Sequence, residues 1–421
     1  MATAPASPER WDVVVVGAGP SGLLCAARAA ERGRRTLLLE KGAKPGVKIL
    51  MSGGSRCNLT HDTDRRGIVE AFGPSGRFLH SALAALDPRQ LVALFESEGM
   101  PTKVEPGGKV FPRSDRAADV QAALLRRLSR AGCTLALEEP LQDVSAGPGG
   151  FQLTTSRRSL AADKLVLATG GKSYPGCGTT GDGYRWAAAL GHTVAEPRPA
   201  LVPVKTDAPW AVALQGITVP DVLVRVIESG GPFGALGELA RCRGSVLFAH
   251  FGLSGPAVLN VSRAVSSHPS PRALNIVCDL APAASRDQFA AMVSRACTQA
   301  GKRRLATILD QWFARRLAVA LMELAGIAPD TRAADLSRHL RQRLVDVVKQ
   351  LRIPLAGTLG FEKAEVTAGG VCLAEVDSRS MESKRVAGLY FAGELLDLDG
   401  PIGGYNFQAA FSTGWLAGES V

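Results

Sequence analysis

Residues 11–41 read WDVVVVGAGPSGLLCAARAAERGRRTLLLEK, and this stretch decides the fold. Four valines lead directly into a glycine-rich turn, an Ala- and Leu-rich helical pattern follows, and a second apolar run ends on Glu40. This order predicts a strand, a tight turn, a helix and a second strand, the first unit of a Rossmann-type sheet. We therefore predict an α/β protein built on a dinucleotide-binding domain.

The residue types in the turn suit contact with a pyrophosphate. Gly17 permits the sharp turn after the strand, Gly19 lets a phosphate approach the main chain, and Gly22 allows the helix to pack closely on the strand. The start of the helix, with Pro20 and Ser21, presents free N–H groups and the positive end of the helix dipole. These residues are predicted to bind the phosphates of the nucleotide.

An acid at the end of the second strand distinguishes this motif from a second glycine-rich pattern later in the chain. Glu40 is placed to accept hydrogen bonds from ribose hydroxyls, and Lys41 beside it is also expected to contact the cofactor. Residues 176–181 (GCGTTG) also fit GxGxxG, but they do not follow a strand directly and no strand ending in an acid lies at the right distance beyond. We expect a loop facing substrate or cofactor there, not a second nucleotide-binding domain.

Composition sets the class of protein. The chain has 421 residues, 46% hydrophobic and 21% charged, which predicts a globular protein of two or three domains. The longest apolar runs have the length of strands, so no membrane partner is expected, and the N-terminal residues show no secretory pattern. Eight scattered cysteines without a CxxC pair argue against a zinc site or a disulfide framework. We expect a cytoplasmic protein without a bound metal.

The net charge of +10 is unevenly distributed. Residues 284–352 contain thirteen Lys or Arg against six Asp or Glu, a net charge of +7. Such a basic segment can bind a polyanion such as RNA. The alternative is that these arginines only decorate solvated helix faces.

The apolar pattern also predicts how the chain is divided. After residues 196–199 (EPRP) strands and turns prevail, amphipathic helices follow, and a strand pattern returns beyond Pro354. This order predicts a nucleotide-binding domain made from both ends of the chain, interrupted by a β-rich and then helical insertion. Residues 134–138 and 151–155 flank a glycine-rich turn and are predicted to form an antiparallel excursion. The predicted boundaries are 1–196 and 354–421 for the nucleotide-binding domain, 197–283 for the β-rich insertion and 284–353 for the helical insertion.

Three further loops are expected at the carboxyl ends of the parallel strands, where such sheets bind ligands. They are 48–60 (KILMSGGSRCNLT), 168–184 (ATGGKSYPGCGTTGDGY) and 391–406 (FAGELLDLDGPIGGYN). The third ends at a helix start, whose N–H groups would stabilise negative charge on a reduced flavin. Its two adjacent glycines, taken alone, better fit an ordinary tight turn before a helix. The residues of these loops expected to contact the cofactor are Lys48, Gly53, Gly54, Arg56, Asn58, Thr169, Gly170, Gly171, Gly393, Glu394, Gly403, Gly404, Tyr405 and Asn406.

Three side chains are candidates for a catalytic proton donor. Cys57 lies in a polar, glycine-rich loop, where Arg56 would favour its thiolate. His250 lies at the end of a predicted strand, and a purely structural histidine is the alternative. Tyr405 can stack on a ring or bond to substrate, with core packing as the competing interpretation.

Several long motifs together resemble the BaiN/RdsA-like family of NAD(P)/FAD-dependent oxidoreductases. The resemblance implies bound FAD in a glutathione-reductase-like domain and an insertion with a β-barrel-like part and a helical part. It implies pyrophosphate binding by the first glycine motif, ribose binding by Glu40, and flavin contacts from the GGSRCN loop, Gly393-Glu394 and residues 403–406. Two departures are Ser55, where glycine is usual, and His61, where asparagine is frequent. The matching motifs are VVGAGPSG, KILMSGGSRCNLTH, KVFPRSDRAADV, LVLATGGKSYPGCGTTGDGY, LFAHFGLSGPAVL, KAEVTAGGV and MESKRVAGLYFAGELLDLDGPIGGYNFQAAFSTGWLAG.

The activities that the resemblance implies are reduction of conjugated C=C bonds in a steroid, formation of dihydrouridine in ribosomal RNA, and oxidation of a small amine. In the first two, hydride moves from reduced flavin to a carbon conjugated to a carbonyl, and a protein acid protonates the neighbouring carbon. We expect a uridine in structured RNA as substrate, bound through residues 284–352, and NADPH or NADH as the transient reductant. The alternatives are an amine or keto-amine oxidase and a non-catalytic, flavin-bearing RNA-binding or assembly factor.

Overall fold

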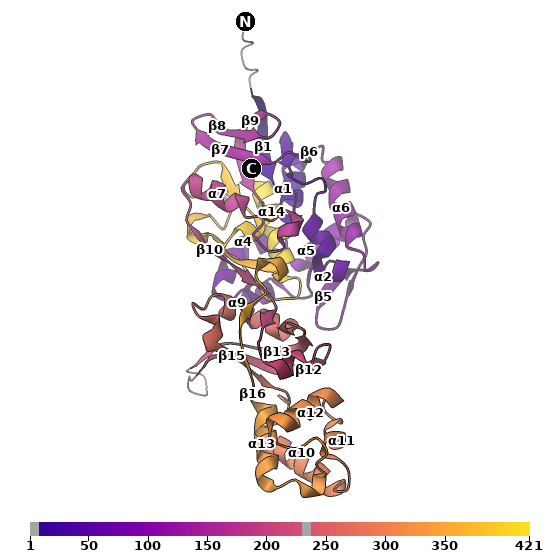
Figure 1. The fold of residues 1–421 in the computed structure, drawn as a ribbon. Coiled ribbons are helices and arrows are strands. Elements are labelled where there is room, and N and C mark those ends of the chain that lie inside the picture. Colours follow the sequence, from indigo (N-terminus) through magenta and orange to yellow (C-terminus); the bar gives the residue numbers. More distant parts are fainter. Residues whose placement is uncertain (1–7, 230–236) are drawn as a thin grey trace. The chain divides into compact units, whose positions relative to one another are not determined.

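The computed structural model describes residues 8–229 and 237–421, which form two compact units. One unit combines the chain up to Arg198 with Glu365–Val421, and the other comprises Pro199–Ala364 (Figure 1). Each unit has its own hydrophobic core, and no residue belongs to both cores. The predicted α/β fold class is confirmed. Every helix in the described ranges is too short or too polar to cross a membrane.

The first unit is built on a sheet whose central strand is β1 (Glu9–Val16). Its four valines are buried because both faces of the strand are covered. β1 pairs in parallel with β2 (Thr36–Leu39) on one side and with β9 (Ser159–Leu167) on the other. The order is β6-β2-β1-β9-β8-β7, with β19 also paired to β9. The other strands of this sheet are β6 (Thr134–Ala136), β7 (Leu141–Gly147), β8 (Gly150–Thr155) and β19 (Leu389–Phe391).

The antiparallel excursion differs from the predicted one. Strand β8 pairs with β7 and β9, whereas β6 pairs in parallel with β2. The expectation that residues 134–138 and 151–155 form one antiparallel excursion is therefore wrong. The sequence pattern missed β7 because only Leu141 and Val144 of that strand are buried, which leaves no clear apolar alternation.

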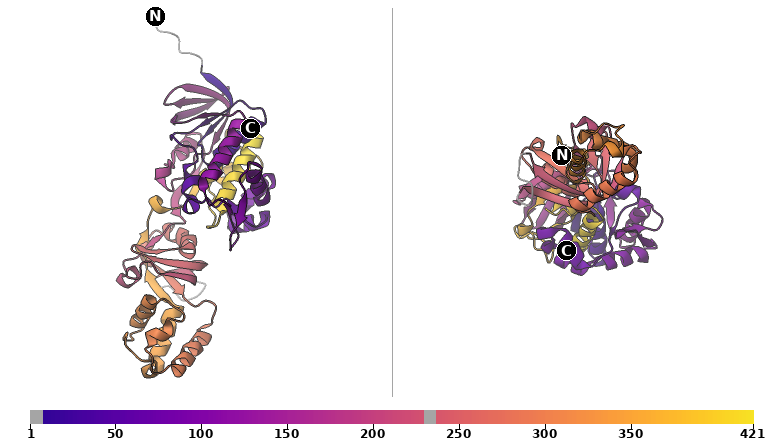
Figure 2. Two further views of the ribbon diagram at one scale, coloured as in Figure 1. Left: turned by 90° about the vertical axis from the view of Figure 1, so that its right-hand side faces the viewer. Right: turned by 90° about the horizontal axis from the view of Figure 1, so that it is seen from below.

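Helix α1 (Pro20–Glu31) packs against the last helix, α14 (Tyr405–Ser420), so the two ends of the chain lie together. A Cβ added at Gly414 would lie 2.3 Å from the main-chain oxygen of Ser21, so the two helix backbones are in direct contact. Figure 2 shows the yellow α14 among the indigo and purple helices of this unit. Other elements of this unit are α2 (Val47–Ser55), β3 (Thr60–His61), α3 (Arg65–Ala71), α4 (His80–Ala85), α5 (Pro88–Ser97), β4 (Thr102–Val104), β5 (Lys109–Pro112), α6 (Ala117–Arg130), α7 (Asp182–Ala189), β10 (Val194–Ala200) and β18 (Val366–Val371).

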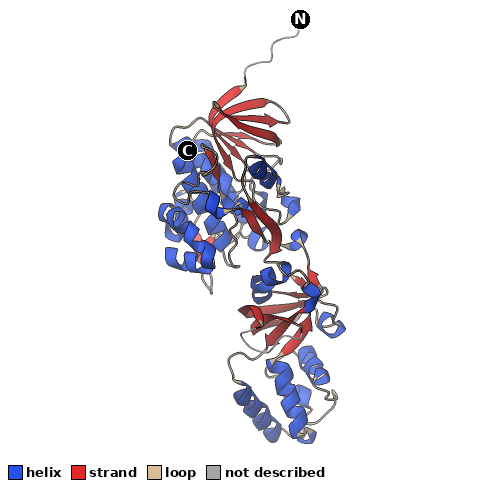
Figure 3. Ribbon diagram, turned by 90° about the vertical axis from the view of Figure 1, so that its left-hand side faces the viewer, coloured by secondary structure: helices blue, strands red, loops and turns tan. Residues whose placement is uncertain are grey.

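The second unit contains an antiparallel sheet followed by helices. The strand order is β16-β15-β12-β13-β14-β11-β17. Strands are red and helices blue in Figure 3, which shows helices α10–α13 grouped at one end of this sheet, where α13 contacts β15 and β16. The elements are β11 (Val204–Lys205), α8 (Pro209–Val212), β12 (Thr218–Glu228), β13 (Glu238–Ala249), β14 (Gly252–Ser254), α9 (Pro256–Ser266), β15 (Leu274–Asp279), α10 (Arg286–Gln299), α11 (Leu305–Leu309), α12 (Arg315–Leu324), α13 (Arg338–Lys349), β16 (Leu351–Pro354) and β17 (Gly357–Thr358).

Candidate active site

The turn between β1 and α1 is fixed by close main-chain packing. The N–H of Gly17 donates to the carbonyl of Leu39 at 2.8 Å, which joins the turn to the end of β2. A Cβ added at Gly22 would lie 1.8 Å from the carbonyl oxygen of Gly17. No side chain fits at this distance, so the first turn of α1 can lie against the strand only because residue 22 is glycine.

The start of α1 is open to a ligand. Gly19 is the N-cap residue, and no side chain caps the free N–H groups of the first turn. A Cβ added at Gly19 would meet nothing within 4 Å. Pro20, which has no N–H to leave unsatisfied, occupies the first helical position. A pyrophosphate can therefore approach uncapped N–H groups at the positive end of this helix.

The main chain orients Glu40 at the end of β2. One carboxylate oxygen accepts a hydrogen bond from the N–H of Ala18 at 2.9 Å, and the other accepts from the N–H of Gly42 at 2.8 Å. Each carboxylate oxygen has a second lone pair, so the group keeps acceptor capacity for ribose hydroxyls.

Lys41 joins this strand end to the 168–184 loop. Its Nζ donates to Thr180 Oγ1 at 2.5 Å and to Asp182 Oδ2 at 2.6 Å. The second glycine pattern thus lies beside β2 and is held there by an ion pair. Contact of Lys41 with a cofactor stays a prediction.

A half-buried polar network joins all three predicted loops. Lys48 Nζ donates to Glu394 Oε2 at 2.5 Å and to Ser173 Oγ at 2.7 Å. The other oxygen of Glu394 accepts from Ser173 Oγ at 2.7 Å and from the N–H of Thr367 at 2.9 Å. Gly171 lies against this network, since a Cβ there would lie 2.3 Å from Thr367 Oγ1. The loops that the sequence placed at the strand ends are therefore in contact.

Arg56 does not activate Cys57. The guanidinium donates to Glu105 at 2.6 Å and lies over the ring of Phe111, 4.2 Å from its centroid. Burial raises the pKa of the Cys57 thiol to about 12, although a hydrogen bond with Ser52 acts in the opposite direction. The expectation that Arg56 favours a thiolate at Cys57 is therefore wrong, because the arginine is occupied by a carboxylate and the sulfur lies in the core.

The start of α14 forms the other side of the candidate site. Gly404, the N-cap residue, has φ = 96°, and a Cβ there would lie 2.4 Å from the carbonyl oxygen of Thr60. No side chain caps this helix start either. The side chain of Asn406 accepts from the N–H of Gly400 at 2.8 Å and donates to its carbonyl at 2.9 Å, which closes the loop before the helix.

His61, at the end of β3, contacts this helix start, and the sequence identified it only as a position where the family often has asparagine. Its ring stacks on Tyr405 with centroids 4.7 Å apart and an interplanar angle of 19°. His61 Nδ1 lies 3.1 Å from the carbonyl oxygen of Gly403, which can only accept, so Nδ1 carries the proton of that hydrogen bond. Burial raises the pKa of the Tyr405 phenol, which is therefore neutral at physiological pH. His61 and Tyr405 lie far apart in the chain, so neither sequence motif indicated that they would stack on one another.

Three buried oxygens of this unit have no hydrogen-bond partner among the described residues. They are Ser21 Oγ, Asn58 Oδ1 and Thr169 Oγ1. They belong to the glycine turn and to two of the three predicted loops. With two uncapped helix starts, the residues present fit a bound FAD.

The remaining predicted residues divide between the two units. Gly53 and Gly54 have φ angles of 55° and 67° inside α2, and Gly170 and Gly393 have φ angles of 72° and 74° in the loops described above. His250 is exposed in the second unit, at the turn after β13, where its ring packs edge-on against Phe251. Its catalytic role stays a prediction.

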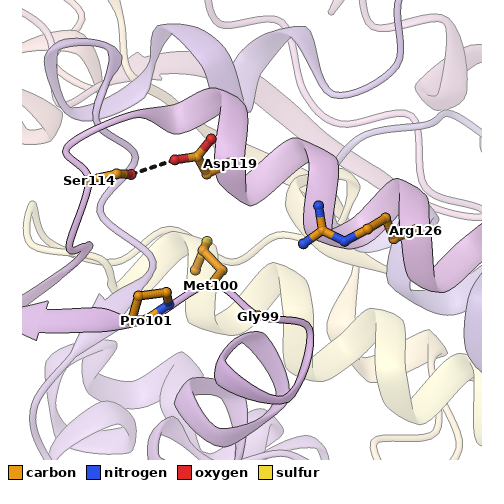
Figure 4. A pocket seen from close by; sticks show the side chains of 6 residues that line it. All are labelled: Gly99, Met100, Pro101, Ser114, Asp119 and Arg126. Atoms are coloured by element: carbon orange, nitrogen blue, oxygen red, sulfur yellow. Dashed lines mark hydrogen bonds between the residues drawn. The ribbon is translucent and has the colours of Figure 1, made fainter.

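A separate surface pocket lies outside this group of residues. Its lining comes from the turn after α5, from the turn before α6 and from α6 itself, and Ser114 Oγ in the second turn donates to Asp119 at 2.6 Å (Figure 4). None of the residues predicted to bind the cofactor lines it. The lining residues are Gly99, Met100, Pro101, Ser114, Asp119 and Arg126.

Comparison with known proteins identifies the family of the chain. Residues 11–420 match the family described as HI0933-like protein Rossmann domain. The chain is 36% identical over 417 residues to a ribosomal RNA dihydrouridine synthase of Escherichia coli (strain K12), covering 98% of each chain. It is 32% identical to a ribosomal RNA dihydrouridine synthase of Haemophilus influenzae, covering 97% of this chain and 98% of that protein. It is 31% identical to a 3-dehydro-bile acid delta(4,6)-reductase of Clostridium scindens, with the same coverage. The chain therefore belongs to the HI0933-like family, the BaiN/RdsA-like oxidoreductases, whose Rossmann-type domain has an FAD-binding fold.

Proposed function

We propose that this protein uses bound FAD to reduce the C5=C6 double bond of a uridine in structured ribosomal RNA, giving dihydrouridine. One observation carries the proposal: the Tyr405 phenol, protonated and stacked on His61, stands at the uncapped start of α14. Two full-length relatives named as ribosomal RNA dihydrouridine synthases support the choice of substrate. A third relative, named as a reductase of a steroid, supports the shared chemistry, because the double bond of uracil is also conjugated to a carbonyl.

The residues of the site divide into binding and proton-transfer roles. The N–H groups at the start of α1 bind the phosphates, and Glu40 accepts from ribose hydroxyls. The start of α14 stabilises negative charge on the flavin ring. When bound, FAD supplies the hydride for the carbon conjugated to the carbonyl. The network of Lys48, Ser173 and Glu394 holds the three loops in register around the cofactor.

Tyr405 is our proposed proton donor for the neighbouring carbon. Its hydroxyl is protonated at neutral pH because burial disfavours the phenolate. His61 is a positioning residue, since its hydrogen bond to the carbonyl of Gly403 and its stacking on the phenol hold Tyr405 in one orientation. Cys57 and His250 are the competing donors, and the burial of Cys57 weighs against it.

The first test is spectroscopic. The purified protein is expected to be yellow, and anaerobic NADPH or NADH is expected to bleach its visible absorption. We propose one of these nucleotides as a transient reductant that binds without a second nucleotide domain. A colourless protein that takes up no added FAD would contradict the proposal. Hydrogen peroxide released from amines in the absence of NAD(P)H would favour an oxidase instead.

The second test is analytical and concerns the substrate. Ribosomal RNA from a strain that lacks the gene is expected to have lost one dihydrouridine, seen as a uridine-containing fragment lighter by about 2 Da in mass spectrometry. Return of the wild-type gene should restore it. An unchanged RNA profile would exclude the RNA substrate. A ribosomal RNA substrate also implies action in the cytoplasm.

A further inference from the structure

Two segments of the second unit meet in a short antiparallel contact. The N–H of Leu305 donates to the carbonyl of Thr331 at 2.9 Å, and the N–H of Ala333 donates to the carbonyl of Arg303 at 3.0 Å. These two bonds enclose a bridge between Arg304 and Arg332. The two arginines thus form the non-hydrogen-bonded type of pair, in which directly opposite side chains lie closest.

The bridge places two like charges on one face. In such a pair the Cβ atoms lie about 4.5–5.5 Å apart on the same side, and opposed like charges destabilise the pairing. The next residues along each segment, Leu305 and Ala333, are buried in the core of the unit and fix the contact. Arg304 and Arg332 are both exposed. The fold therefore starts two arginine side chains from directly opposite positions, an arrangement that the repulsion of like charges disfavours.

Two further cations adjoin this pair. Lys302 and Arg303 are exposed and directly precede Arg304. Lys302, Arg303, Arg304 and Arg332 form no ion pair with any residue of the described ranges, Asp330 and Asp335 on either side of Arg332 included. We name these four residues the cation platform.

Some other cations of the helical segment are paired with acids, whereas others, such as Arg338 and Arg343, form no ion pair within the described ranges. Arg286 pairs with Asp346 at 2.7 Å, and Arg315 pairs with Asp310 at 2.9 Å. The platform differs from these other unpaired arginines because Arg304 and Arg332 lie directly opposite one another across a bridge. Surplus charge on solvated helix faces does not require two arginines to be opposed in this way, whereas an external polyanion would neutralise both.

We propose that the cation platform binds consecutive phosphates of the RNA substrate. This inference rests on the proposed function, which supplies RNA as the partner. Arginine forks bind phosphate oxygens with two parallel hydrogen bonds, and phosphates neutralise the repulsion between Arg304 and Arg332. Contacts of this kind position the RNA without reading its sequence.

The test compares two double variants of the full-length protein with FAD bound. Arg304→Ala with Arg332→Ala removes the opposed pair, and Arg286→Ala with Arg315→Ala removes the same charge from the same segment as a control. Binding of a fluorescein-labelled 30-nucleotide RNA hairpin is measured by anisotropy between about 50 and 400 mM salt. The platform variant is expected to bind about 10–100-fold more weakly and to lower the salt slope by about 1.4–1.8, since each of the two lost phosphate contacts removes about 0.7–0.9. The control is expected to change the affinity by less than about threefold.

Three readouts separate this proposal from the proposed function. The melting temperature of the platform variant should equal or exceed that of wild type, because a repulsion is removed, and NADPH should bleach both variants alike. The platform variant should fail to restore dihydrouridine in the deletion strain, whereas the control should restore it. Full restoration by the platform variant, or equal hairpin binding by both variants, would overturn the platform while leaving the proposed function intact. Failure of the wild-type gene to restore dihydrouridine would overturn the proposed function. Platform-dependent binding of anionic vesicles in place of RNA would overturn the inferred partner.

Discussion

At the scale of single residues, Tyr405 provides the sharpest test of the chemistry. Tyr405→Phe keeps the ring that stacks on His61 and removes only the hydroxyl. Reoxidation of reduced flavin by substrate is expected to slow by about 10²–10⁴-fold, because general acid catalysis contributes that much. Anaerobic reduction of the flavin by NADPH should change by less than about threefold, since it needs no proton from this group. Stopped-flow absorbance measures both half-reactions.

The pH dependence of reoxidation tests the same assignment. Because burial raises the pKa of Tyr405, its donor form persists throughout the neutral range and is lost only above about pH 10. The rate of flavin reoxidation by substrate should therefore stay constant through the neutral range and fall only at alkaline pH. His61→Asn serves as a control that leaves the phenol in place, and the reoxidation rate of this variant should also fall only at alkaline pH. A decline between about pH 6 and 7 in wild type would instead identify an imidazole donor.

Cys57 is expected to be structural. Its thiol is fully buried with a pKa of about 12, so iodoacetamide at pH 8 should leave it unmodified in the folded protein. Cys57→Ala should lower the free energy of unfolding by about 1–2 kcal/mol, measured by urea denaturation, because a small buried volume is lost. Substrate turnover should remain within about threefold of wild type. A loss of more than about 10²-fold with intact FAD binding would make Cys57 the donor.

At the scale of elements, the β1–α1 turn separates two roles of glycine. Gly22→Ala places a Cβ 1.8 Å from the carbonyl oxygen of Gly17, so α1 must shift and we expect a loss of about 3 kcal/mol or more. A Cβ at Gly19 meets no protein atom within 4 Å, so Gly19→Ala should leave the apoprotein within about 1 kcal/mol of wild type. It should nevertheless weaken FAD binding about 10–100-fold by obstructing the phosphates. Thermal melts of the apoprotein and FAD titration by fluorescence measure the two effects. Equal stability losses in both variants would contradict this division.

The same elements show how far the sequence could predict the site. The strand, turn and helix of residues 11–41 were predictable because each glycine answers a local steric demand, as at Gly22. The stack of His61 on Tyr405 and the ion pair of Lys41 with Asp182 were not predictable, since each joins segments far apart in the chain. Strand β7 was missed for another reason: an exposed edge hairpin carries little apolar alternation. Local conformation is thus encoded in short motifs, whereas the partners across the site depend on the whole sheet.

At the scale of the whole molecule, FAD should stabilise one unit. The first unit and the second unit have separate hydrophobic cores, and every predicted cofactor-binding residue belongs to the first. Calorimetry of the apoprotein is therefore expected to show two transitions. FAD at 100 times its Kd should stabilise the first unit by about 2.7 kcal/mol and raise its transition by about 5–10 °C, leaving the other unmoved. Gly19→Ala, which weakens FAD binding, should show a smaller shift at the same FAD concentration. A single transition would show that the two cores unfold together. Two transitions that FAD shifts equally would show that the effect of cofactor binding is not confined to the first unit.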